Sequence, residues 1–188
     1  MIFNVQNGCS SEYAAVVQTY QQSIYRYCLR LLGNRQDAED AAQDIFIKAF
    51  ESIGQYQHTA SFSSWLFKIA YRHCLNLLRK RKYQLRLLHR LFKPEVVVES
   101  PEQEMDKRLF SPQLATALTL LSPEDRSLLI MYIFEERTYS ELSEIMGCKP
   151  EALKKRLSRM KGKVRRILQD WREDEKWEEK KKTLDLKI

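Results

Sequence analysis

Glycine and proline are scarce in this sequence, with 5 of each among 188 residues. A protein built from many short strands needs these residues in its tight turns, so their scarcity favours helices. No stretch approaches the ~20 apolar residues that span a bilayer, and the first residues lack the basic start and apolar run of a signal peptide. We therefore expect an all-α, cytoplasmic protein without membrane insertion.

Cysteine and histidine are too dispersed to suggest a metal site. The four cysteines stand at positions 9, 28, 74 and 148, and the three histidines at 58, 73 and 89. No two cysteines form a CxxC pair, and the histidines supply no metal-ligand spacing. The thiols are therefore predicted to be core residues or free thiols in a reducing compartment. We expect no metal and no other cofactor.

Acidic residues are missing from two long stretches. Between Glu51 and Glu95 there are nine Lys or Arg and no acid, and between Glu151 and Asp170 there are eight and no acid. The segment 94–151 carries twelve acids against five bases. Solubility alone would intersperse the two signs, whereas clustered positive charge is typical of proteins that bind a polyanion. Nucleic acid is therefore an expected partner.

Apolar periodicity divides the chain into two helical blocks. The first has helical spacing from Ser11 to Leu32, where Gly33 is expected to end a helix, and again from about Phe62 to Leu91. A segment rich in proline, valine and acids separates the blocks. The predicted fold is two small helical domains at 8–92 and 112–170, a flexible linker at 93–111 and a charged tail at 171–188.

The second block contains the pattern of a helix-turn-helix motif. Thr138 and Glu141 form a capping box before a short helix that stops at Gly147, and a basic helix follows. An ordinary helical hairpin with a solvated basic face is the alternative. Because the 18 residues after Glu151 contain no acid for i,i+4 pairing, a DNA-reading helix is favoured. Its candidate contacts are Ala152, Lys154, Lys155, Arg156 and Arg159.

Aromatic residues are interleaved with the basic residues of the first block. Aromatic faces beside a positive groove suit the unstacked bases of single-stranded DNA. The alternative is that these rings are core residues, and Trp65, four residues before Ile69, fits that role. A membrane-surface helix is disfavoured because Cys74, Asn76 and Gln84 interrupt its apolar face.

A short acidic segment, DAEDAAQDIF, occupies residues 37–46. Acids at the start of a helix complement its dipole, which accounts for Asp37 and Asp40. Gln43 and Asp44 lie further along, where the dipole has little effect. An exposed face of acids and amides also suits a protein partner, so this segment is a candidate docking surface.

Together these segments resemble the extracytoplasmic-function (ECF) sigma factors, a two-domain family of bacterial RNA polymerase. The resemblance covers about Tyr20 to Leu168 and is carried by YRYCLRLLGNRQDAEDAAQDIFIKAF, FSSWLFKIAYRHCLNLLRKRK and LSPEDRSLLIMYIFEERTYSELSEIMGCKPEALKKRLSRMKGKVRRIL, in that order. It implies a sigma factor that binds core polymerase, recognises the minus-ten and minus-thirty-five promoter elements, and melts DNA. It also implies an anti-sigma partner.

The resemblance implies a role for each segment. The residues implied to contact the clamp helices of the polymerase β′ subunit are Asp37, Asp40, Gln43, Asp44 and Phe46. The residues implied to bind the minus-ten element and melt the DNA are Tyr56, Phe62, Trp65, Lys68, Arg72, Asn76, Arg79 and Lys80. The loop from Gly54 to Ser61 would hold a base flipped out of the non-template strand. The recognition helix, with Ala152, Lys154, Lys155, Arg156 and Arg159, would read the minus-thirty-five element, and its domain would contact the polymerase β flap.

Three other classes fit the sequence less well. A regulator that merely contains a helix-turn-helix would begin with a receiver or ligand-binding domain that has strands, whereas the first half is helical in pattern throughout. A nuclease needs clustered carboxylates, and the two basic stretches contain none. An adaptor such as an anti-sigma protein needs no pair of basic DNA-binding faces. We therefore expect a sigma factor rather than an enzyme, with no catalytic residue.

Overall fold

The described part of the chain is helical. The computed structural model describes residues 2–7, 9–91 and 110–185, and no strand occurs among them. The elements are α1 (Ile2–Gln6), the 3-10 turn η1 (Ser10–Glu12), α2 (Tyr13–Leu32), α3 (Arg35–Ser52), η2 (Ile53–Gln55), α4 (Phe62–Leu91), α5 (Pro112–Thr119), α6 (Pro123–Ile133), α7 (Tyr139–Met146) and α8 (Pro150–Asp185). The predicted all-α, two-domain class is confirmed. None of these described helices is long and apolar enough to cross a membrane.

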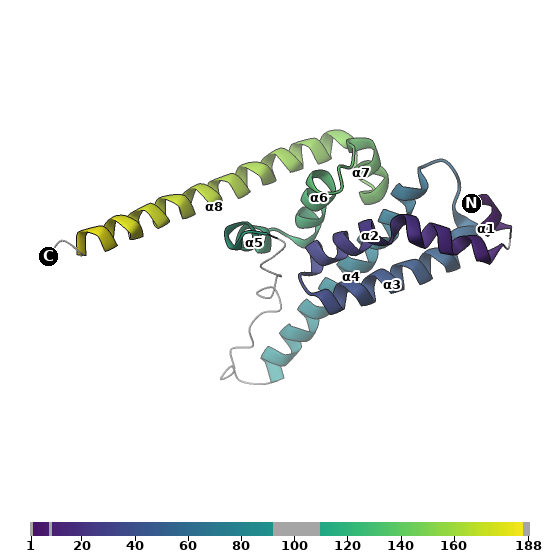
Figure 1. Ribbon diagram of the computed structural model, residues 1–188, viewed down its shortest axis with the longest axis horizontal. Coiled ribbons are helices and arrows are strands. Elements are labelled where there is room, and N and C mark those ends of the chain that lie inside the picture. The colour runs from purple at the N-terminus through teal and green to yellow at the C-terminus, as the bar shows by residue number, and fades with distance from the viewer. Residues whose placement is uncertain (1, 8, 92–109, 186–188) are drawn as a thin grey trace.

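The first domain is formed by α2, α3 and α4, which pack together (Figure 1). Gly33 ends α2 with a left-handed φ of 78°, a conformation that costs glycine little. Asn34 then caps α3, its Oδ1 accepting a hydrogen bond from the Asp37 backbone N–H at 3.1 Å. The reversal brings the apolar faces of the helices together. The buried core of the first domain includes Ile24, Leu31, Ile45, Leu66 and Phe67.

The second domain contains α5 to α8. The side-chain oxygens of Ser111, Ser122 and Thr138 each cap the helix that follows them. Gly147 ends α7 with a φ of 70° and allows the turn into α8, so the predicted helix-turn-helix is confirmed. α8 packs on α5, α6 and α7 through a buried stripe. The stripe contains Leu153, Leu157, Met160 and Val164.

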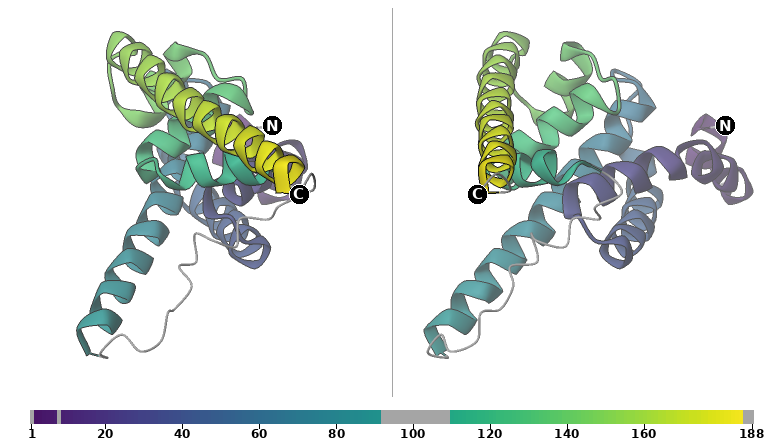
Figure 2. Two further views of the ribbon diagram at one scale, coloured as in Figure 1. Left: turned by 90° about the vertical axis from the view of Figure 1, so that its left-hand side faces the viewer. Right: turned by 60° about the vertical axis from the view of Figure 1, so that its left-hand side comes forward.

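The ends of several elements differ from the sequence prediction. α1 lies before residue 8, where the first domain was expected to begin, and its Val5 is buried. α8 continues without a break to Asp185 and so includes most of the predicted tail (Figure 2). The predicted linker at 93–111 lies outside the described residues apart from Phe110, which is buried, and Ser111. The domain limits themselves stay predictions.

The two domains are packed against each other. α2 and α4 of the first contact α6 and α7 of the second. Tyr27 Oη and Ser127 Oγ lie 2.7 Å apart in a buried hydrogen bond. Arg30 Nη1 donates to Glu135 Oε1 at 2.7 Å. Because a buried polar group is costly to leave without its partner, these pairs favour one relative position of the domains.

Candidate DNA and polymerase interfaces

The first turns of α8 present a basic face to solvent. Leu153, Leu157 and Met160 are buried on the other side of the helix, which fixes how the helix is rotated on its domain. The exposed side therefore carries four of the five predicted contacts, namely Ala152, Lys154, Lys155 and Arg159. The arrangement can place several cations against the major groove of a duplex at once.

Arg156, the fifth predicted contact, is partly buried and paired. Its Nε donates to Asp125 Oδ1 at 2.5 Å, in the first turn of α6. The adjacent Glu124 accepts a hydrogen bond from Arg79 Nη2 of α4 at 3.0 Å. Two consecutive acids of α6 thus hold one predicted DNA-contacting arginine from each domain.

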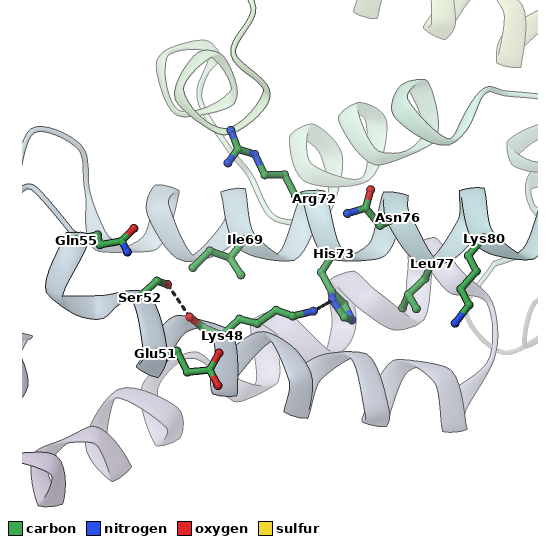
Figure 3. Close-up of a pocket in the computed structure, with 10 residues that line it drawn as sticks. All are labelled: Lys48, Glu51, Ser52, Gln55, Ile69, Arg72, His73, Asn76, Leu77 and Lys80. Carbon is green, nitrogen blue, oxygen red and sulfur yellow. Dashed lines mark hydrogen bonds between the residues drawn. The ribbon is translucent and has the colours of Figure 1, made fainter.

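The predicted minus-ten residues of α4 align along that helix. Positions 68, 72, 76 and 79–80 are three or four residues apart and so fall on neighbouring turns. Lys68 is partly buried, and the exposed members are Arg72, Asn76, Arg79 and Lys80. In Figure 3, Arg72 and Asn76 point away from α3, toward the helices of the second domain. The contacts of α4 with α6 and α7 are consistent with that view.

A groove of about 650 Å³ lies between α3 and α4 (Figure 3). The ammonium groups of Lys48 and Lys80 line it, against the single carboxylate of Glu51, whereas the charged end of Arg72 points away from α3. A groove with this excess of positive charge can attract a phosphate backbone.

His73 forms the wall of this groove and joins α4 to α3. Its Nδ1 accepts a hydrogen bond from Lys48 Nζ at 2.5 Å, and its Nε2 lies 3.6 Å from Asp44 Oδ2. Burial of the ring, followed by the nearby Lys48 ammonium, lowers the pKa of His73, while Asp44 opposes the change. The ring is therefore neutral at pH 7. In that state it orients the side chain of Lys48 within the groove.

The loop from Gly54 to Ser61 is built around an aromatic cluster. The rings of Tyr56, Phe62 and Trp65 have centroids 5.3 to 5.4 Å apart. Tyr56 and Phe62 are each only 8% exposed, whereas Trp65 is more accessible. The rings therefore support the loop from within. A base held by the loop would meet its outer atoms, and contact with Tyr56 and Phe62 stays a prediction.

The predicted polymerase contacts of α3 have different surroundings. Asp40, Gln43 and Asp44 are exposed, as an interface requires. Asp37 instead forms an ion pair with Arg81 of α4. The fifth residue, Phe46, is nearly buried and lines a groove of about 570 Å³ between α2 and α3. Docking on this surface stays a prediction for all five.

Sequence reasoning missed two exposed apolar side chains beside that groove. Ile47 is 57% exposed and Phe50 is 44% exposed. Ile47 follows Gln43 by four residues and Asp44 by three, so helical geometry places it on the polar face of α3. An isoleucine on a polar face was the available signal. Together with the acids it makes a mixed surface typical of protein interfaces.

These features are typical of one class of protein, the two-domain helical DNA-binding factors. Residues 16–83 match the family model of Sigma-70 region 2, and residues 111–164 match that of Sigma-70, region 4. The chain belongs to the sigma-70 family and, within it, to the ECF sigma factors. The family and the sigma-factor function expected from the sequence are confirmed.

Relatives align along most of the chain. The ECF RNA polymerase sigma factor SigW of Bacillus subtilis is 28% identical over 178 residues, which cover 90% of this chain and 95% of SigW. The ECF RNA polymerase sigma factor SigE of Mycolicibacterium smegmatis is 31% identical over 157 residues, which cover 81% of this chain and 60% of SigE.

Solved structures share the fold. CnrH, in a complex with the cytosolic domain of CnrY, superposes with a TM-score of 0.68 at 18% identity, covering 90% of this chain and 95% of CnrH. The sigma factor RpoE from Bartonella quintana, in a complex with the anti-sigma factor NepR, has a TM-score of 0.65 at 18% identity, covering 84% and 97%. The all-helical arrangement described above therefore occurs in both of these solved structures.

Proposed function

We propose that this protein docks on core RNA polymerase in the bacterial cytoplasm, places the polymerase on a promoter and opens the DNA, acting by binding and not by catalysis. The observation that carries the proposal is the pair of basic surfaces on α4 and α8, one in each domain. On α8, a buried apolar stripe turns the basic side chains outward. One cationic surface would suit many polyanion binders, whereas two on separate domains suit a promoter with two separated elements.

The two domains divide the work. α8 reads the minus-thirty-five duplex through its exposed Lys154, Lys155 and Arg159, because a helix of this kind fits the major groove. The first domain binds the minus-ten element, where the positive groove between α3 and α4 holds the backbone of the opened strand. The loop 54–61 holds an extruded base.

Core polymerase binds the outer face of α2 and α3. The groove between α2 and α3, which Phe46 lines, binds an apolar side chain of the clamp helices, and the exposed Ile47 adds apolar contact. Asp40, Gln43 and Asp44 supply the polar rim. The second domain contacts the β flap.

The packed arrangement of the two domains belongs to the free protein. The two promoter elements are about 25 base pairs apart, which corresponds to roughly 85 Å of duplex. In this structure the two DNA-contacting faces lie close together, because Arg79 and Arg156 are bound by the consecutive residues Glu124 and Asp125. The Tyr27–Ser127 and Arg30–Glu135 contacts therefore cannot persist when both elements are bound, and the domains separate on the promoter.

An anti-sigma polypeptide is the expected inhibitory partner. It would bind the free protein and cover the surfaces that polymerase or DNA needs. The support comes from the complexes of CnrH with the cytosolic domain of CnrY and of RpoE with NepR, whose folds resemble this chain.

Run-off transcription tests the proposed function. The purified chain is added to core polymerase on a library of genomic fragments, with core polymerase alone as the control. Discrete transcripts that require the chain are expected, and their start sites define the promoter. A matched variant, R72A/R79A, should still bind core polymerase but leave the minus-ten region closed to permanganate. A chain that binds core polymerase yet starts no transcript on any fragment would contradict the proposal.

A further inference from the structure

The side chain of Gln6 directs all of its hydrogen-bonding atoms at one segment of the first domain. Its Nε2 donates to the backbone oxygens of Ile53 and Tyr56, both at 2.9 Å. Its Oε1 lies 3.2 Å from the Nε2 of His58, which must donate because an amide oxygen only accepts. One glutamine thus joins α1 to η2 and to the loop that follows it.

α1 is held firmly enough to make Gln6 a fixed support. Val5, its neighbour, is 5% exposed and belongs to the core. Asn4 Nδ2 donates to Glu12 Oε1 at 2.7 Å, and the Cys9 backbone N–H donates to Asn4 O at 3.0 Å. The short helix is therefore fastened to the start of α2 independently of Gln6.

The loop 54–61 is held from two sides. On the inner side, Tyr56 Oη donates to Ala60 O at 2.7 Å and the Tyr56 ring packs on Phe62 and Trp65. On the outer side, Gln6 restrains the loop entrance through its hydrogen bonds to the backbone oxygens of Ile53 and Tyr56. The His58 ring is exposed and packs edge-on against Tyr56, with centroids 4.7 Å apart. Gln6 thereby sets both the backbone of the loop and the direction of an exposed ring.

We propose that Gln6 is a positioning residue for recognition of the extruded promoter base: it holds the loop and His58 in the orientation that reads the base. Gln6 itself does not touch DNA. The inference rests on the proposed role of the loop 54–61 in holding that base. It extends the base-reading site to a helix that lies outside the matched region 2, residues 16–83.

Base preference separates a positioning role from simple support of the fold. If Gln6 only stabilised the domain, its loss would lower initiation equally for all promoter sequences. If Gln6 orients the loop, its loss lowers the difference between the preferred base and the others. The measured quantity is the ratio of initiation rates with the best and the worst non-template base at the extruded position.

The experiment uses holoenzyme assembled from core polymerase and the full chain, on four promoters that differ only at that base. Q6A is expected to lower the ratio roughly fivefold to tenfold, which is the effect of losing about one hydrogen bond between the protein and the extruded base. Q6E should do the same, because a carboxylate cannot donate to the Ile53 and Tyr56 oxygens. F3A, which removes an exposed side chain of the same helix that takes no part in holding α1 or Gln6, should keep the wild-type ratio. H58A should lower the ratio, and Q6A/H58A should lower it little further.

Three outcomes would overturn the inference. The first is a wild-type ratio in both Gln6 variants, and the second is an equal loss on all four promoters. The third is a wild-type protein with no preference at any base of the minus-ten region, which would remove the role of the loop as well. Initiation on the unaltered promoter separates these results from failure of the sigma function, because a wild-type protein that initiates but does not discriminate is still a sigma factor.

Discussion

Arg156 illustrates how one side chain can serve the fold and the DNA in turn. In this structure its guanidinium donates to Asp125 at 2.5 Å, yet about a third of its side chain is exposed, at 31%. The pair holds the arginine beside the exposed lysines of the recognition helix. A bidentate arginine–guanine contact would require the guanidinium to turn from Asp125 to the base edge.

Replacement of Arg156 and of Asp125 separates these two roles. R156A should weaken binding of a minus-thirty-five duplex roughly tenfold to a hundredfold, because a base contact is worth about 1–3 kcal/mol. D125A, which breaks the same pair but leaves the arginine, should keep or tighten binding. Fluorescence anisotropy at fixed salt measures both. Equal weakening in the two variants would mean that the ion pair only orients the helix.

His73 gives the first domain a pH dependence of defined sign. Its pKa is lowered in the folded protein, chiefly by burial and by Lys48 of α3, against the opposing Asp44. The unfolded chain, with an ordinary histidine pKa of about 6.5, therefore binds more protons below that pH. The contribution of His73 to the free energy of unfolding is fully present above about pH 6.5. It is lost as the pH falls from about 6.5 to the lower pKa of the folded state.

Urea unfolding between pH 7.5 and 5.5 measures this dependence. H73N keeps an acceptor for Lys48 and removes the titration, so its midpoint should change less with pH than that of the wild type. H58N is the matched control, because His58 is exposed and its ring touches neither Lys48 nor Asp44 in the described contacts. The same pH slope in H73N and the wild type would rule out His73 as the cause.

At the scale of the element, the helices that sequence predicted are those whose ends have local signals. Gly33, Thr138 and Gly147 each end or cap a helix as predicted, because these motifs depend on residues within one turn. α1 has five residues, too few for an apolar period, and contacts with η1, η2 and α2 hold it. Sequence alone therefore could not reveal α1, nor Gln6 beside the loop.

The capping box of α7 should set the stability of the helix-turn-helix. Thr138 Oγ1 accepts from the Glu141 backbone N–H at 3.3 Å, and Glu141 Oε2 accepts from the Thr138 backbone N–H at 2.9 Å. T138A should lower the free energy of unfolding by about 0.5–2 kcal/mol and weaken duplex binding in parallel. S140A, one exposed position within the same first turn, is the control. If T138A and S140A have the same denaturant midpoint, the cap assigned to Thr138 is wrong.

At the scale of the whole molecule, the contacts that hold the domains together join residues about a hundred positions apart. Tyr27 pairs with Ser127 across 100 positions, and Arg30 with Glu135 across 105. No periodicity or motif links such residues, so the sequence predicted two domains and their functional faces but not their packing. For the same reason it could not predict that Glu124 of one domain holds Arg79 of the other.

Arg30 and Glu135 control whether this packing persists. The Glu135 side chain is only 4% exposed, and burial raises the pKa of its carboxyl despite the opposing charge of Arg30. R30E would put a second acid beside the buried Glu135 and leave Arg26 and Arg137 as the cations that still act on its carboxyl, which is strongly unfavourable. The domains should then separate, and the release of Arg79 from Glu124 would free a predicted DNA contact. Small-angle scattering should show a larger radius of gyration for R30E.

The reversed pair R30E/E135R tests whether charge complementarity is the cause. Because it restores an ion pair of opposite polarity at the same place, it should return the radius of gyration toward the wild-type value. Free R30E should bind promoter duplex more tightly than the wild type without core polymerase, and the reversed pair should lose part of that gain. A single variant as compact as the wild type, or a double variant as open as the single, would mean that the apolar contacts alone hold the domains closed. The first result would also imply that separation on the promoter is driven by polymerase and DNA acting against the whole interface, not by release of this one ion pair.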